Sequence, residues 1–186
     1  PTLNELLRVA SEAHVAGLMT GKAGIVHLHL GDGEKKLSLL RAALDQSEIP
    51  ARVFNPTHVN RNLMLFEDAL SLTEAGCHID LTAFPEGHID PGISAAEAFL
   101  LYQAGGYPAR QLTISSDGGG CLPSFDERGE LTRMGIGDSQ TLHDTLKQLL
   151  NEGIALDAIL PSMTSNVADL LRLKAKGRLS AGQDAD

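Results

Sequence analysis

A regular alternation between short apolar runs and segments with helical periodicity extends along this 186-residue chain and restricts the folds open to it. Repeated strand–helix units predict a parallel sheet, because each helix returns the chain to the same end of the sheet. The strands are nearly continuously apolar, which is typical of a sheet covered on both faces. We expect strands over 24–30, 52–59, 77–84 and 111–116, with a longer loop after the last. The first helix is expected to begin at Leu3 and to be closed by Gly17 and Gly21. Further helices are expected over 35–44, 63–75, 93–104 and 139–150, with two short ones within 156–171.

Two α/β architectures contain such units. A doubly wound sheet normally carries a glycine-rich G-x-G-x-x-G loop after its first strand, and 31–33 reads only Gly-Asp-Gly. In a (β/α)8 barrel, polar residues collect at the carboxyl ends of several strands, because those ends converge on one active site. This chain shows that pattern. We therefore predict a partial (β/α)8 TIM-type barrel, with about four βα units plus closing helices.

Histidines and an aspartate mark three of these strand ends. His27 and His29 are two residues apart on one strand and share a face, which is the interior face in a barrel. His58 follows the second strand, and Asp117 ends the fourth strand before three glycines. Taken singly, each has an ordinary explanation: a buried histidine bonded to a neighbouring strand, a polar loop residue, or a turn former. Together they offer imidazole and carboxylate ligands of the types that zinc prefers.

Within this set we assign roles by position. His29 lies nearer the strand end than His27, so His29 is the predicted ligand and His27 supports it or packs. Asp117 can bind a metal with one oxygen and take a proton from an attacking water with the other. The glycines after it let the backbone approach a substrate closely, since they carry no Cβ.

Five blocks of the sequence resemble the metal-dependent amidohydrolase superfamily. They are 26–32 (VHLHLGD), 56–62 (PTHVNRN), 115–120 (SSDGGG), 160–168 (LPSMTSNVA) and 176–186 (KGRLSAGQDAD). The second block is similar to the isoaspartyl (β-aspartyl) dipeptidase family in particular. The resemblance covers the whole chain. It implies that 1–186 is the C-terminal half of a catalytic barrel, without the N-terminal barrel half and the small β-domain.

The resemblance implies a metalloprotease that hydrolyses the isopeptide bond of β-aspartyl dipeptides. The family binds two zinc ions bridged by a carboxylated lysine, and a bridging hydroxide attacks the amide carbon. It implies that His29 and His58 bind one zinc and that Asp117 binds the other and acts as acid and base. It also implies that Arg61 holds a substrate carboxylate, a contact that suits a guanidinium. Without the resemblance, Arg61 would read as a solvent-exposed arginine at a helix start.

Several features depart from that family. The first His-x-His motif, the carboxylated lysine and a catalytic tyrosine would lie upstream of Pro1. We therefore expect the chain alone to bind zinc weakly and to hydrolyse nothing. Cys121 stands where the family has a serine that contacts substrate, and a thiol is only a weak donor. The alternatives for Cys121 are a spectator or a soft residue near zinc. The other polar candidates are interpreted as lid, surface or helix residues: His14, His78, His88, Asp90 and His143.

The composition limits the classes of molecule that we expect the chain to bind. The formal net charge of −9 disfavours nucleic acid and anionic membranes. Two cysteines form no disulfide framework, and no apolar run reaches bilayer length, so we expect a cytoplasmic protein. We expect a homo-oligomer that acts on a small dipeptide. Two alternatives stay open: a cyclic amidase resembling dihydroorotase or hydantoinase, and a non-catalytic half-barrel that assembles with a partner.

Overall fold

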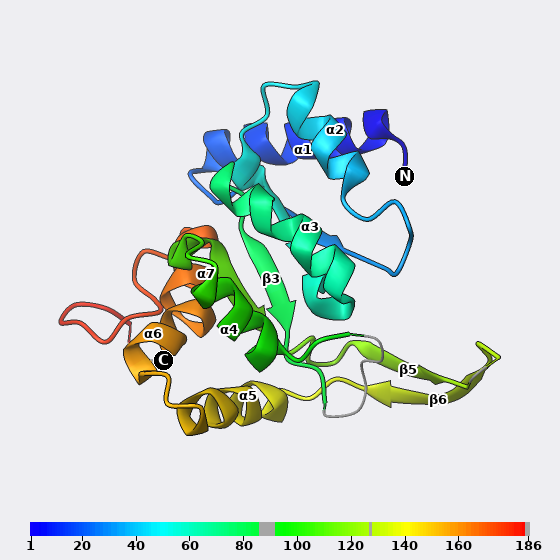
Figure 1. Cartoon of the computed structure of the whole chain (residues 1–186). Coiled ribbons are helices and arrows are strands. Elements are labelled where there is room, and N and C mark those ends of the chain that lie inside the picture. The colour runs from blue at the N-terminus through cyan, green and yellow to red at the C-terminus, as the bar shows by residue number, and fades with distance from the viewer. Residues whose placement is uncertain (86–91, 127, 185–186) are drawn as a thin grey trace.

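The computed structural model of the chain describes residues 1–85, 92–126 and 128–184, and it shows a mixed α/β structure (Figure 1). The helices are α1 (Leu3–Thr20), α2 (Ser38–Asp45), α3 (Leu63–Glu74), α4 (Ala95–Ala104), α5 (Gln140–Asn151), α6 (Leu156–Met163) and α7 (Ser165–Leu170). The strands are β1 (Val26–His29), β2 (Phe54–Thr57), β3 (Ile79–Thr82), β4 (Leu112–Ser115), β5 (Cys121–Phe125) and β6 (Leu131–Ile136). The described residues also form three short 3-10 helices: η1 (Ala51–Val53), η2 (Val59–Arg61) and η3 (Ala109–Gln111).

The first four strands form two parallel pairs, as the strand–helix alternation predicts. β1 pairs with β2, and β3 pairs with β4, with Val26 opposite Phe54 and Ile79 opposite Leu112. In the described part of the chain, β2 and β3 share no backbone ladder. Side chains connect the two pairs instead.

The core is mostly aliphatic and lies between the strands and the helices that follow them. All four residues of β2 and of β3 are buried, which agrees with a sheet covered on both faces. β1 differs, because its residues alternate between half-buried and exposed, and His27 and His29 are the exposed ones. The expectation that these two side chains face an enclosed interior is therefore not met within this chain. Among the described strands β1 has a neighbour on one side only, so its inner face stays open.

The C-terminal end of α1 differs from the prediction at one of the two expected glycines. Gly17 does not close α1 but lies buried inside it, and the helix ends at Gly21, whose φ of 71° is left-handed. A Cβ on Gly17 would lie 2.7 Å from the Cα of Gly24, so this position needs glycine for the close approach of the chain entering β1.

The prediction of a longer loop after the fourth strand is wrong, because this segment forms the antiparallel hairpin β5–β6. Pro123 and Gly135 interrupt the apolar pattern of the two strands, which made the segment resemble a loop. The turn has its own signal in Asp126, whose carboxylate accepts hydrogen bonds from the backbone N–H groups of Arg128 and Glu130. In Figure 1 the hairpin projects away from the rest of the molecule.

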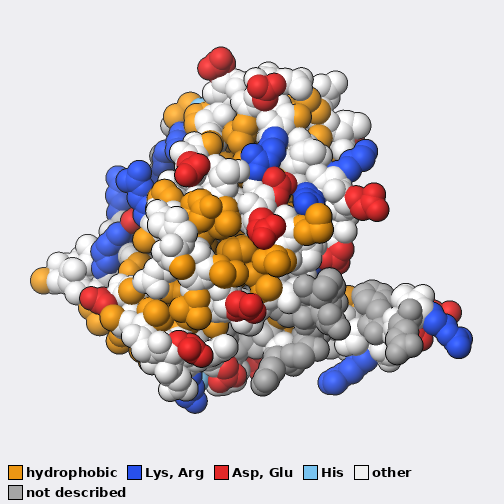
Figure 2. All heavy atoms as spheres, viewed as in Figure 1, with side chains coloured by type: hydrophobic (Ala, Val, Ile, Leu, Met, Phe, Trp, Pro, Cys, Tyr) orange, Lys and Arg blue, Asp and Glu red, His pale blue; other side chains and the backbone are white. Residues whose placement is uncertain are grey.

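The surface is of mixed character. Figure 2 shows hydrophobic side chains gathered in the middle of the face on which α4 lies, with acidic and basic side chains scattered around them. None of the described helices is long and apolar enough to cross a membrane.

Candidate metal centre

The structure brings His29, His58 and Asp117 together at the carboxyl ends of β1, β2 and β4. One potential ligand atom from each lies within 4.8 Å of the others. The Nδ1 atom of His29 lies 2.9 Å from the Nε2 atom of His58. Residues 29, 58 and 117 are far apart in sequence, so only the parallel arrangement of the strands makes them neighbours.

Backbone conformation is unusual at two of these three positions. His58 has a φ of 62° and Asp117 a φ of 50°, both in the left-handed region. Within the described residues, only Lys36 and Arg172 are further non-glycine examples. Such a conformation costs about 1–3 kcal/mol at each residue and persists where the surrounding structure enforces it. The strain at these two strand ends therefore points to a site whose side-chain directions matter.

The His58 ring is fixed by both of its nitrogens. It is 4% exposed, and Nδ1 lies 2.7 Å from the Thr82 hydroxyl oxygen while Nε2 faces His29. Burial lowers the pKa of His58, and the negative charge of Asp117 opposes this shift. A lowered pKa favours the neutral imidazole, which is the form that binds metals. If Nδ1–H donates to Thr82, the lone pair of Nε2 points into the cluster.

His27 takes a different position from His29. Its Nδ1 lies 2.7 Å from the side-chain oxygen of Asn55, and its ring meets the His29 ring edge-on at a centroid distance of 4.9 Å. His27 thus contacts the neighbouring strand and one member of the cluster without joining the cluster.

The turn that carries Asp117 is enclosed by glycines. A Cβ on Gly137 would lie 2.2 Å from the Asp117 carbonyl oxygen, and one on Gly120 would lie 2.7 Å from the Asp117 carboxylate. Backbone bonds from Gly119 to Gly137 and from Gly137 to Gly120 tie the turn to the base of the hairpin. The missed hairpin therefore contributes to the site, because it holds the aspartate in its left-handed conformation.

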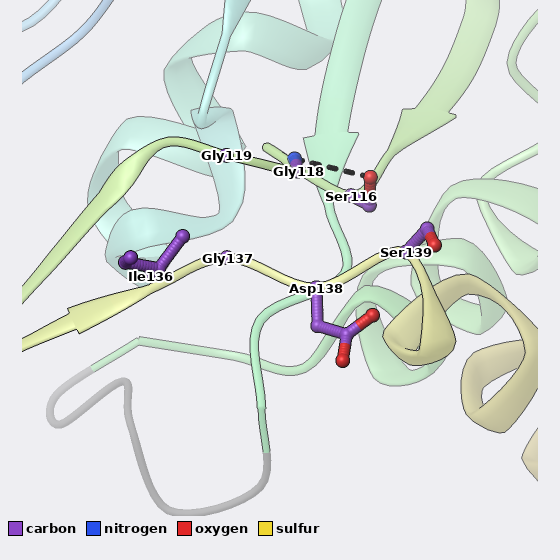
Figure 3. Close-up of a pocket in the computed structure, with 7 residues that line it drawn as sticks. All are labelled: Ser116, Gly118, Gly119, Ile136, Gly137, Asp138 and Ser139. Carbon is purple, nitrogen blue, oxygen red and sulfur yellow. Dashed lines mark hydrogen bonds between the residues drawn. The ribbon is translucent and has the colours of Figure 1, made fainter.

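A shallow pocket lies beside this turn, and none of the three cluster residues lines it (Figure 3). Inside it, the Ser116 hydroxyl accepts a hydrogen bond of 3.1 Å from the backbone N–H of Gly118. The pocket is lined by Ser116, Gly118, Gly119, Ile136, Gly137, Asp138 and Ser139.

Arg61 lies on η2, three residues after His58, and not at a solvent-exposed helix start. Its side chain is 32% exposed, with Nη1 3.7 Å from the Asp32 carboxylate. The guanidinium lies over the Phe84 ring, 5.8 Å from its centroid. Among the described residues, the buried Nε atom of Arg61 has no hydrogen-bond partner. A guanidinium beside the cluster could bind an anionic group.

The remaining predicted residues lie elsewhere. Cys121 is exposed at the first position of β5. His14 lies on α1 and His143 is exposed on α5. His78 precedes β3, and its buried Nδ1 atom finds no hydrogen-bond partner in the part of the chain that the structure describes. His88 and Asp90 lie outside the described residues.

Sequence reasoning missed one buried carboxylate close to the cluster. Asp80, on β3, is 3% exposed and accepts hydrogen bonds from three hydroxyl groups. The sequence does contain one sign of Asp80, an aspartate within an otherwise apolar run. A carboxylate in such a run is buried with the strand and therefore needs hydrogen-bond partners.

No protein-family model matches the chain. Solved structures of β-aspartyl dipeptidase from the thermophilic, keratin-degrading bacterium Fervidobacterium islandicum AW-1 do match it. The structure in complex with the β-Asp-Leu dipeptide superimposes with a TM-score of 0.90 at 36% identity, over 100% of this chain and 48% of that one. A second structure of the enzyme gives a TM-score of 0.84 at 33% identity, over 100% of this chain and 46% of that one. The chain thus spans about half the length of the β-aspartyl dipeptidases to which it is structurally similar.

Proposed function

We propose that this chain supplies part of the active site of a zinc-dependent β-aspartyl dipeptidase of the amidohydrolase type. The observation that carries the proposal is the meeting of His29, His58 and Asp117 within 4.8 Å. It occurs in a chain that resembles, along its full length, a dipeptidase solved with β-Asp-Leu.

The same observations support a partial (β/α)8 barrel. The cluster lies at the carboxyl ends of parallel strands, where active sites of such barrels are found. We propose that residues 1–186 form the C-terminal half of this barrel, and that further strands beside β1 and β4 complete it. These strands would cover the inner face of β1, on which His27 and His29 are exposed.

The donor set suits zinc. Imidazole nitrogens and carboxylate oxygens are common catalytic zinc ligands. In this assignment His29 and His58 hold one ion and Asp117 holds the other. Donor atoms around a tetrahedral zinc lie about 3.3 Å apart when each metal–ligand bond is about 2.0–2.1 Å. The His29–His58 separation of 2.9 Å is close to that value, so small movements would admit an ion. In the complete enzyme we propose two ions, with a carboxylated lysine from outside this chain as the bridging ligand.

Zinc, when bound there, would polarise the amide carbonyl and make a water molecule more acidic. The chain's own residues would bind and orient the reactants. Asp117 would accept the proton of the attacking water at a carboxylate oxygen and return it to the departing amine. Arg61 would bind a substrate carboxylate through its guanidinium donors. Cys121 would contribute at most a weak hydrogen bond to substrate.

Zinc binding and complementation test this proposal. The metal-free chain is titrated with zinc against a chromophoric chelator, and β-Asp-Leu hydrolysis is assayed with the chain alone and after mixing with the N-terminal half of the F. islandicum dipeptidase. We expect weak zinc binding and no turnover by the chain alone, and hydrolysis of β-Asp-Leu after complementation. Dihydroorotate and hydantoin are assayed in the same way, because they are the cyclic substrates that the alternative cyclic amidase would hydrolyse.

Each other outcome has a defined meaning. Hydrolysis of the cyclic substrates in preference to β-Asp-Leu would replace the dipeptidase assignment with a cyclic amidase. A stable chain that binds no zinc, alone or complemented, would make it a non-catalytic assembly module. Robust turnover by the chain alone would contradict the need for ligands from outside it. Cytoplasmic location and homo-oligomer formation remain predictions that fractionation and gel filtration can test.

A further inference from the structure

The junction between β2 and β3 is held by side chains where a backbone ladder would be expected. Both flanking pairs, β1–β2 and β3–β4, have regular parallel ladders, but β2 and β3 share none in the described chain. The side chain of Asn60 bridges the gap instead, donating to the Thr82 carbonyl at 3.0 Å and accepting from the Thr82 N–H at 2.8 Å. Thr57 donates to Asp80 across the same junction. The relative position of β2 and β3 therefore depends on a few polar side chains.

Asp80 occupies the centre of this junction. Thr57 of β2 and Ser115 of β4 each donate to its Oδ2 atom at 2.6 Å, and Thr113 of β4 donates to its Oδ1 atom at 2.6 Å. One carboxylate on β3 thus joins the strands on both sides. A buried charge is tolerated only when its oxygens are well satisfied, and three hydroxyl donors provide this.

The partners of Asp80 lie next to the cluster residues in sequence. Thr57 immediately precedes His58, and Ser115 is two residues before Asp117. Thr82, two residues after Asp80 on the same face of β3, contacts the His58 ring at 2.7 Å. Asp80 therefore contacts β2 and β4, whose ends are followed by His58 and Asp117, and it lies on β3, whose Thr82 contacts the His58 ring.

We propose that Asp80 is a positioning residue, which fixes His58 and Asp117 relative to each other and so sets the metal affinity of the site. The proposal rests on the proposed function, because it assigns Asp80 to the same centre. Asp80 does not bind the metal or the substrate; it acts through Thr57 and Ser115. Residues that orient metal ligands through hydrogen bonds typically change metal affinity by about 10–100-fold when they are replaced.

Asp80→Asn tests this with little change in shape. The amide places a donor where a carboxylate oxygen accepted, so at least one of the three hydroxyl bonds must be lost or reversed. We expect zinc affinity, measured by chelator competition, to fall about 10–100-fold. Asp68→Asn is the matched control, because Asp68 also accepts several bonds, from Arg41 and the Leu37 N–H, but joins α2 to α3. We expect that control to lower thermal stability and to leave zinc affinity unchanged.

A metal-free readout separates this proposal from the proposed function. We expect the ring N–H of His58, bonded to Thr82, to give a slowly exchanging proton signal in NMR spectra of the metal-free protein. Asp80→Asn should broaden or lose that signal, and Asp68→Asn should keep it. If the unaltered chain binds no zinc but the signal still responds to Asp80→Asn, the proposed function fails and the positioning role stands.

Thr57 gives a second, milder pair of variants in case Asp80→Asn does not fold. Thr57→Val removes the hydroxyl that reaches Asp80, whereas Thr57→Ser keeps it. We expect weaker zinc binding and a perturbed His58 signal only for the valine variant. The proposal is overturned if Asp80→Asn and Thr57→Val lower thermal stability while zinc affinity and the His58 signal stay as in the unaltered chain.

Discussion

His58 and Arg178 show two ways in which this molecule holds polar groups. His58 is 4% exposed and has partners from two other strands, His29 and Thr82. Arg178 forms two bonds, of 3.0 and 2.7 Å, to Asp169, which is nine residues away and also largely in solvent. The strand-end partners are distant in sequence and cannot rearrange independently, whereas the surface pair is local and screened by water.

The comparison predicts that equal chemical changes have unequal effects. At the strand ends, a lost partner leaves a buried group unsatisfied, and the left-handed backbone at His58 and Asp117 offers little freedom to adapt. At the surface, water replaces the lost partner.

His58→Asn should have the largest effect. Asparagine tolerates the left-handed conformation of this position, so the variant removes the imidazole without adding backbone strain. We expect zinc affinity to fall by more than the roughly 100-fold that supporting residues can cause. Chelator competition measures the affinity, and His143→Asn on the exposed face of α5 is the control. Unchanged zinc binding by His58→Asn would remove this residue from the centre.

Gly137→Ala should have an intermediate effect. The added Cβ would lie 2.2 Å from the Asp117 carbonyl oxygen, so the turn must move. We expect a loss of stability of about 1–3 kcal/mol, as for other overpacked positions, together with weaker zinc binding. Urea unfolding and zinc titration measure the two effects.

Gly135→Ala is the matched control, because Gly135 lies on β6 two residues before Gly137. Its Cβ would meet the Leu122 carbonyl oxygen at 3.3 Å, a contact that small adjustments can relieve. If both alanine variants behave alike, the hairpin base does not hold Asp117 in the way that its geometry indicates.

Arg178→Gln should have the smallest effect, and that effect should depend on pH. The hydrogen bonds from Arg178 lower the pKa of Asp169 in the folded protein. A lowered pKa stabilises the fold above the unfolded aspartate pKa of about 3.9, and this contribution is lost as the pH falls through the folded value. Thermal melts of both proteins should therefore differ slightly at pH 7 and converge below about pH 4. Salt should narrow the difference at pH 7, and a difference that grows on acidification would contradict the assignment.

Part of the site follows from sequence spacing alone. Apolar runs that each end in His29, His58 or Asp117 predict strands with polar carboxyl ends, and parallel pairing then places those ends together. The structure has the strands and their parallel pairing at these positions. This part was predictable because it depends on local periodicity and on the general rule that strand–helix units give parallel strands.

Asp80 and the hairpin were not predictable in the same way. The donors to Asp80 lie 23, 33 and 35 residues away, and nothing in the local pattern says which hydroxyl groups will surround it. The hairpin strands carry Pro123 and Gly135, which disfavour strands unless a neighbour supports them. Both features depend on contacts between segments, and these contacts are not encoded in any one segment.

The sequence alone sets the order of the four strand–helix units and the types of side chain that end their strands, because periodicity and turn residues act over short distances. Tertiary structure decided the distances between those side chains, the left-handed backbone at His58 and Asp117, and the carboxylate of Asp80 that joins three strands. The reason is physical: a hydrogen bond or a metal ligand set requires atoms to lie within a few tenths of an ångström of their places. Only the packing of segments that are distant in sequence places these atoms with that precision.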